Sequence, residues 1–260
     1  MPGRSGQDAS DKCGEEMWIK SLNKLYTEFD GNMAKAIHTW ILTAQVIFPP
    51  GIAVPMTAKP LKIDLLSLHK KSASKLDKAI KGKTAKLTGP ATMTAGKINW
   101  EEMCTQIGKD FLEKYPKAVV TACANCISIV PPGVISLPNA GNLAPLPPIY
   151  SGLKDSLLKT TMQPFFGGTI KAQGAIIDTT IKAATSAMSG AGASGAGVIV
   201  WNTVLKILLP VLITELSNAT RIFFTQSVGA WKTPPGPGNP VIIAVPTPGV
   251  ISLPATILIV

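Results

Sequence analysis

The chain has 260 residues and a formal net charge of +10, and charged residues make up only 15% of it. Glycine (23 residues) and proline (22 residues) are frequent, but hydrophobic residues reach 46%, which excludes a disordered low-complexity chain. A monomer of this length with so few charges would expose much apolar surface, so the composition favours burial against partner subunits or lipid.

The first elements in chain order are a polar arm, residues 1–14, and a helical stretch from Glu15 to Val46. The arm has no apolar segment typical of a secretory signal, so we expect synthesis in the cytoplasm with reduced cysteines. Asp30-Gly31-Asn32 interrupts the helical pattern as a turn or a helix end, and Phe48-Pro49-Pro50-Gly51 starts an extended path. The apolar face at spacings of three and four comprises Met17, Trp18, Leu22, Leu25, Tyr26 and Phe29.

A basic amphipathic helix is predicted from about Leu61 to Lys81, with Gly82 as its stop. From Lys59 to Lys86 nine lysines face only two aspartates, a net charge of +7. This charge favours an anionic partner: nucleic acid, a phospholipid surface or an acidic subunit. The alternative is a solvated helix face, because arginine and interleaved aromatic residues are missing here. The expected contact residues are Lys70, Lys71, Lys75, Lys78 and Lys81.

A phrase of seven residues, PGVISLP, occurs at Pro132–Pro138 and again at Pro248–Pro254, with a looser version at Pro50–Pro55. Trp100-Glu101-Glu102-Met103 also resembles Gly14-Glu15-Glu16-Met17, and both are followed by a helix-compatible stretch that ends in Pro-Pro-Gly. We interpret PGVISLP as the extended exit of a repeated helix-then-strand unit.

The expected fold is therefore α+β: helix-rich units that each end in a Pro-Pro-Gly exit to short β-strands. The predicted parts are the arm 1–14, a first unit 15–97, a second unit 98–190, and a third part 191–260 with an apolar helix and an extended C-terminus. Residues 84–96 are expected to form a strand pair or a loop. The second unit is expected to contain two further helical segments, Leu153–Thr161 and Thr169–Met188.

The last 28 residues, Thr233–Val260, carry no charge and are rich in β-prone residues. An exposed end of this kind promotes aggregation, so it should pair as a strand within the chain or on a neighbour. Apolar helix faces and this segment together form the predicted subunit interface, at Trp18, Trp40, Trp201, Val250, Ile251 and Leu253.

Patterns that would indicate catalysis or metal binding are weak. Gly82-Lys83-Thr84 lacks the earlier glycine and the strand–loop–helix order of a phosphate-binding loop. Cys123-x-x-Cys126 is half of a zinc or redox pattern, but buried apolar cysteines explain it more simply. His38 and His69 belong to no recognisable nucleophile or metal pattern. We expect no enzyme, no metal and no cofactor.

Residues Ala196–Thr214 are nineteen residues with a single charge, at Lys206, which is long enough to span a bilayer. Asn202, Lys206 and Pro210 are costly or awkward in an isolated span, so a buried helix in a multimer is the favoured interpretation. A membrane-associated protein that inserts this segment remains the alternative.

The helix Met33–Val46, with the sequence AKAIHTWILTAQV after Met33, runs into Phe48-Pro49-Pro50-Gly51-Ile52-Ala53-Val54. This stretch resembles structural proteins of bacteriophage virions, of the tail, baseplate or neck. The resemblance implies a non-enzymatic assembly subunit, made in the host cytoplasm, that forms a ring or stack with itself and other virion proteins. A basic capsid or neck protein that contacts DNA through Lys59–Lys86 is a further alternative.

Overall fold

The computed structural model describes residues 11–48, 52–55, 57–123, 149–151, 153–186, 196–226, 230–233, 243–245 and 250–252. The chain divides into two compact units. The first unit comprises Met1–Met33, Asp64–Lys114 and Met162–Glu215, and the second comprises Ala34–Ile63, Tyr115–Thr161 and Leu216–Val260. These discontinuous units do not coincide with the consecutive parts 15–97, 98–190 and 191–260.

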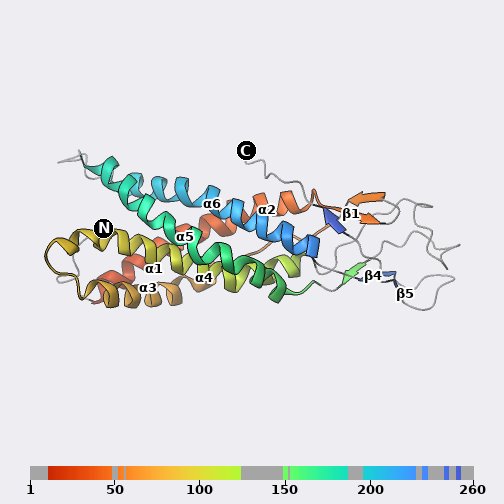
Figure 1. Ribbon diagram of the computed structural model, residues 1–260, viewed down its shortest axis with the longest axis horizontal. Helices are drawn as coiled ribbons and strands as arrows, with labels where there is room; N and C mark the ends of the chain where they lie inside the picture. The colour runs from red at the N-terminus through yellow and green to blue at the C-terminus, as the bar shows by residue number, and fades with distance from the viewer. Residues whose placement is uncertain are drawn as a thin grey trace. The chain divides into compact units, whose positions relative to one another are not determined.

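Long helices build the first unit (Figure 1). They are α1 (Asp11–Glu28), α3 (His69–Thr84), and residues of α4 (Ala95–Cys123), α5 (Asp155–Thr185) and α6 (Ala196–Gln226), each of which also gives residues to the second unit. Short segments add a π-helical turn (Phe29–Met33) and 3₁₀ turns at Leu66–Leu68 and Gly89–Thr94. The predicted apolar face is confirmed at Trp18, Leu22, Leu25 and Tyr26 of α1 and at Phe29 of the π-helical turn, which are all buried, whereas Met17 is only half-buried.

Two local expectations are wrong. Asp30-Gly31-Asn32 lies inside the π-helical turn, so the helical path continues where a break was expected. The basic helix starts at His69 and ends at Thr84, not at 61 and 81. Residues 61–65 are not helical, and Leu61, Ile63 and Leu65 are buried in alternation.

Two further helix expectations also changed. The region 84–96 forms a 3₁₀ turn and the start of α4, with no strand. The segments Leu153–Thr161 and Thr169–Met188 join into one helix, α5, which runs through Pro164, Gly167 and Gly168. Burial of Met162, Phe166 and Ile170 at spacings of four gives this stretch enough packing to outweigh the helix-breaking residues.

The second unit contains α2 (Ala34–Ile41), the remaining residues of α4, α5 and α6, and short strands. Antiparallel strands form two three-stranded sheets with the orders β2-β1-β6 and β3-β4-β5. In this unit the Tyr115 and Thr220 hydroxyls share a buried hydrogen bond of 2.8 Å. The strands are β1 (Gln45–Phe48), β2 (Ile52–Pro55), β3 (Ile149–Ser151), β4 (Ala230–Thr233), β5 (Ile243–Val245) and β6 (Val250–Ser252).

The α+β fold class expected from the sequence is wrong, because the packed part of the structure is helical. The strands have only three or four residues each, whereas α4, α5 and α6 have 29, 31 and 31 residues. A four-residue strand buries few side chains, while a helix of 30 residues buries a long apolar stripe. The Pro-Pro-Gly exit at 49–51 therefore joins two short strands and defines no sheet domain.

Candidate functional site

The predicted anionic-partner residues share the outer face of α3, which we call the lysine face: Lys70, Lys71, Lys75, Lys78 and Lys81. All five are exposed, while Ser72, Ala73, Leu76, Asp77 and Ile80 are buried on the other side. Lys81 is paired with Asp77 at 2.7 Å, and Lys70, Lys71 and Lys78 form no ion pair within the described ranges. The structure thus gathers the predicted lysines on one accessible surface.

The start of α3 is fixed by two aspartates. The Asp30 carboxylate, presented by the π-helical turn, accepts hydrogen bonds from the backbone N–H groups of Leu65 and Leu66, at 2.9 and 2.8 Å. Burial raises the pKa of Asp30, and these two hydrogen bonds partly oppose the rise. A π-helical turn often marks a site with a specific role. Here it places the Asp30 carboxylate at the N-terminus of the 3₁₀ turn Leu66–Leu68, which leads into α3.

Asp64 makes the turn that leads into α3. Its φ of 62° lies in the left-handed region, which aspartate and asparagine tolerate better than most residues. Its carboxylate accepts hydrogen bonds from Lys114 Nζ at 2.8 Å and from Ser67 Oγ at 2.9 Å. The hydrogen bond from Lys114 is the main cause that lowers the pKa of Asp64. This pair connects the α3 entry to α4.

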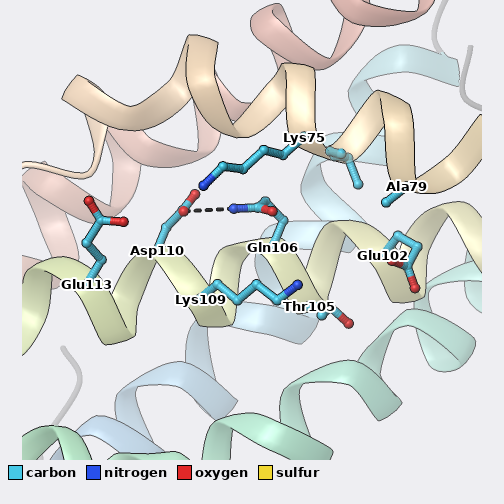
Figure 2. A pocket seen from close by; sticks show the side chains of 9 residues that line it. Lys75, Ala79, Glu102, Thr105, Gln106, Lys109, Asp110 and Glu113 are labelled. Atoms are coloured by element: carbon cyan, nitrogen blue, oxygen red, sulfur yellow. Dashed lines mark hydrogen bonds between the residues drawn. The ribbon is translucent and has the colours of Figure 1, made fainter.

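A shallow pocket of about 300 Å³ lies between α3 and α4 (Figure 2). Its α4 wall carries Glu102, Gln106, Asp110 and Glu113, and Figure 2 shows Lys75 reaching from α3 along this wall. At the far end Lys83 of α3 forms an ion pair with Glu102. An acidic wall of α4 is therefore covered by lysines of α3.

Behind this wall lies a buried polar cluster that holds α1 against α4. The Tyr26 hydroxyl donates to Asp110 at 2.5 Å, and the Gln106 side-chain amide donates to the other carboxylate oxygen at 2.9 Å. Desolvation raises the pKa of both Tyr26 and Asp110. Because every donor here is satisfied within the core, the cluster fixes the register of the two helices.

The first unit contains two antiparallel helix pairs, α1–α3 and α4–α5, and the same kind of contact occurs in both. In the α1–α3 pair, a Cβ on Gly14 would lie 2.6 Å from Asp77 Oδ1, and Asp77 forms an ion pair with Lys81. In the α4–α5 pair, a Cβ on Gly96 would lie 2.5 Å from Asp178 Oδ1, and Asp178 forms an ion pair with Lys182 at 2.6 Å. Each aspartate thus meets the first turn of the neighbouring helix, where the helix dipole favours negative charge.

These shared contacts set the register of the internal repeat. Gly14 and Gly96, Trp18 and Trp100, Phe29 and Phe111, and Gly51 and Gly133 are each 82 positions apart. The match of Glu15-Glu16-Met17 with Glu101-Glu102-Met103 differs from this register by four residues, about one helical turn. A shift of 101 residues then carries Gly96 and Trp100 onto Gly197 and Trp201 of α6.

Burial supports the repeat. The central stripe of each of α1, α4 and α6 is buried at the equivalent positions, as expected for amphipathic helices that pack on one core. Phe29 and Phe111, which are equivalent, pack on each other at 5.7 Å between ring centres. The equivalent buried residues are Ser21 and Leu25 in α1 with Phe29 in the π-helical turn after it, Met103, Ile107 and Phe111 in α4, and Val204, Leu208 and Leu212 in α6.

The predicted interface residues fall into three groups. Trp18 and Trp40 are only 3% and 5% exposed, so they are core residues of this chain and offer little surface to another subunit. Trp201 is half-buried, with Lys24 Nζ 5.6 Å from its ring centre. Val250 and Ile251 lie on β6 and pair with Ile47 and Val46 of β1, while Leu253 lies outside the described residues.

The residues weighed for metal or redox chemistry are separated or buried. Cys104 and Cys123 are both buried, and burial raises the pKa of Cys104 to about 12. Cys126 lies outside the described residues. Within the described ranges no group of three or more histidine, cysteine, aspartate or glutamate side chains is placed to hold a metal ion.

Helix α6 contains the one described segment, Val200–Phe224, that is long and apolar enough to cross a membrane. One third of its most apolar window is buried inside the structure. The exposed positions of this segment are Asn202, Lys206, Pro210 and Thr214, at spacings of four, so they form one exposed stripe in which all residues except Pro210 are polar.

Comparison of the chain with protein-family models, curated proteins and solved structures finds no match. The candidate surfaces therefore rest on the geometry of this chain. Sequence reasoning found the lysine face but missed Asp30, Asp64 and the Gly14–Asp77 and Gly96–Asp178 contacts. The 82-residue spacing of glycine and tryptophan was the available signal for the last two.

Proposed function

We propose that the chain is a non-enzymatic structural subunit of a bacteriophage virion, which assembles into a ring or stack of the tail, baseplate or neck. The resemblance of Met33–Val54 to such proteins and the low share of charged residues support this proposal. Its partners are further copies of the chain and other virion proteins. It needs no catalytic centre, metal or cofactor.

The observation that carries the proposal is the environment of α6. This helix is apolar over most of its circumference, yet only a third of its apolar window is buried. A helix of this kind requires cover from another protein or from lipid. Since Asn202 and Lys206 occupy its exposed stripe, contact with lipid would place an amide and a charge in hydrocarbon, which is costly. Protein cover on the apolar flanks is the more favourable solution.

The lysine face supplies the second contact of the proposed subunit, with an acidic neighbour or with DNA. We expect that Lys70→Ala, Lys71→Ala, Lys75→Ala and Lys78→Ala together remove most of the binding to a short DNA duplex or to a polyglutamate peptide. Binding by the parent chain should fall steeply with salt. The matched control replaces exposed lysines of α5, Lys159 and Lys171, and should bind as the parent does. Equal binding by both variants would remove this assignment.

Light scattering on the purified chain, with and without detergent, tests the proposed function. A discrete soluble multimer in the absence of detergent is the expected result. The second candidate, a membrane-associated protein, is favoured by the length and apolarity of Val200–Phe224. It predicts a chain that stays in solution only with detergent, and that outcome would overturn the assembly proposal.

A further inference from the structure

The strands on either side of β1 come from two copies of one repeated phrase. The sheet has the order β2-β1-β6, and both neighbours run antiparallel to β1. Strand β2 lies in the looser copy at 50–55, and β6 lies in the exact copy PGVISLP at 248–254. All three strands belong to the second unit. The phrase is therefore a segment that pairs with β1.

The heptapeptide that contains β6 occurs once more in the chain. This other copy spans residues 132–138, which lie outside the described part of the chain, and it is identical to 248–254 at all seven positions. Its central residues Val134, Ile135 and Ser136 therefore correspond to the three residues of β6. The pairs between β6 and β1 are Val250 with Ile47, Ile251 with Val46 and Ser252 with Gln45.

Identical sequences leave β1 no means of distinguishing the two copies. Any contact that β1 makes with the seven residues of one copy is open to the other, and neither copy carries a charge that would oppose strand pairing. Because β2 occupies one edge of β1, the described sheet offers a single edge to this heptapeptide. Each chain thus carries two copies of the heptapeptide for one such edge.

We propose that residues 132–138 of a second copy of this chain replace β6 beside β1, in the antiparallel register that β6 has. Addition of a strand to a sheet edge supplies affinity through main-chain hydrogen bonds, and exchange of an identical element between protomers is a low-cost route to association. The occupant depends on concentration. A segment tethered in its own chain has the advantage in dilute solution, whereas closely spaced copies in a ring or stack favour the segment of a neighbour.

Disulfide trapping between two full-length chains of different mass tests this exchange, with oxidised glutathione as the oxidant. One chain carries Val46→Cys and the other Ile135→Cys, at positions that the register of β6 places opposite each other. Opposite residues of an antiparallel pair have Cα atoms about 4.5–5.5 Å apart, which a disulfide spans. Both chains also carry Cys13→Ser and Cys126→Ser, so that the remaining native cysteines are buried.

The expected product is a disulfide-linked pair of unlike chains, identified by its mass. A chain with Ile251→Cys, mixed in the same way with the Val46→Cys chain, should react within about threefold of the rate of Ile135→Cys, because thiol access is the same in identical heptapeptides. The matched control is Asn139→Cys, which lies four residues beyond Ile135 and hence about 13 Å from the opposite position. It should react at least about tenfold more slowly, because no disulfide spans that distance.

Other results would overturn the proposal. Equal reaction of Ile135→Cys and Asn139→Cys would indicate random collision. Reaction of Ile251→Cys without reaction of Ile135→Cys would exclude 132–138 as the occupant. A cross-link confined to a single chain that carries both Val46→Cys and Ile135→Cys, or no cross-link at all, would exclude a second copy as the donor.

This inference rests on the proposed assembly function, since it names a contact between copies of the chain, but it can fail separately. A discrete multimer without detergent, in which the Val46→Cys and Ile135→Cys chains do not cross-link, would retain the assembly function and lose the strand exchange. A chain that stays soluble only in detergent would lose the assembly function itself.

Discussion

The two antiparallel helix pairs of the first unit, α1–α3 and α4–α5, pack through different residues. Polar side chains hold α1 and α3, through Asp30 at one end and Asp77 at the other. Glycines hold α4 and α5: Gly96, Gly108 and Gly174 each lie against the facing helix. The comparison teaches that the aspartate at the start of the neighbouring helix is the shared feature, while the rest of each interface is free to vary.

The largest expected change in stability is in the α4–α5 pair, where glycines lie in the helix contact. A Cβ on Gly174 would lie 2.5 Å from Glu101 Cα, and a backbone atom cannot move aside cheaply. We expect Gly174→Ala to lower the free energy of unfolding by about 3 kcal/mol, measured by urea denaturation. The control Gly167→Ala, on the same helix with no atom within 4 Å of the new Cβ, should raise stability by about 0.5–1 kcal/mol. Equal effects at both positions would contradict the close packing of α4 and α5.

The polar cluster gives the next largest effect. Tyr26→Phe removes the hydroxyl that donates to Asp110 and leaves a buried carboxylate with one donor fewer, so we expect a loss of about 2 kcal/mol. Tyr115→Phe removes a bond between two neutral hydroxyls, and we expect a loss of about 1 kcal/mol. Thermal or urea unfolding of both variants checks the order, and a larger loss for Tyr115→Phe would contradict the role given to Asp110.

The glycine–aspartate contact that occurs in both helix pairs should contribute equally to stability in each. Gly14→Ala and Gly96→Ala each bring a methyl group against a carboxylate oxygen, and a flexible aspartate side chain has room to turn away. We expect each variant to lose about 1 kcal/mol of stability, with the two losses equal within about 0.5 kcal/mol. A clear loss of stability in one helix pair and none in the other would contradict the equivalence of the two contacts.

The smallest effect depends on pH. Since the Lys114 hydrogen bond lowers the pKa of Asp64 below its usual 3.8, the charged carboxylate stabilises the fold above that value. The contribution is lost as pH falls through the lowered pKa. Asp64→Asn, which tolerates the left-handed φ, should cost about 0.5 kcal/mol at pH 7 and nothing at low pH. A difference that grows on acidification would have the wrong sign.

The sequence predicted the apolar face of α1 and the exposed lysines of α3, because both depend on local periodicity. It did not predict the π-helical turn or the non-helical segment 61–65. These depend on Asp30 reaching Leu65 and Leu66, more than thirty residues away. The sheet-forming exits were overestimated, since proline and glycine signal an extended path but not its length.

Prolines and repeat register show the same limit. Pro116, Pro164 and Pro210 all lie inside helices, where packing along the buried stripe outweighs the lost backbone hydrogen bond. The repeat was visible in PGVISLP, but its helical register required knowing that Gly14 and Gly96 meet equivalent aspartates. For the candidate sites, the lysine face followed from composition, whereas the contacts of Asp30 and Asp64 depend on residues far apart in the sequence.

Hydrogen exchange on the dilute chain, without partner or detergent, tests most directly the claim that α6 is incompletely covered within this chain. Amides near Leu205–Leu209 should exchange faster than the equivalent amides near Cys104–Gly108, because fewer packed side chains oppose local opening. Equal protection of the two segments would contradict the claim that α6 needs cover from another protein.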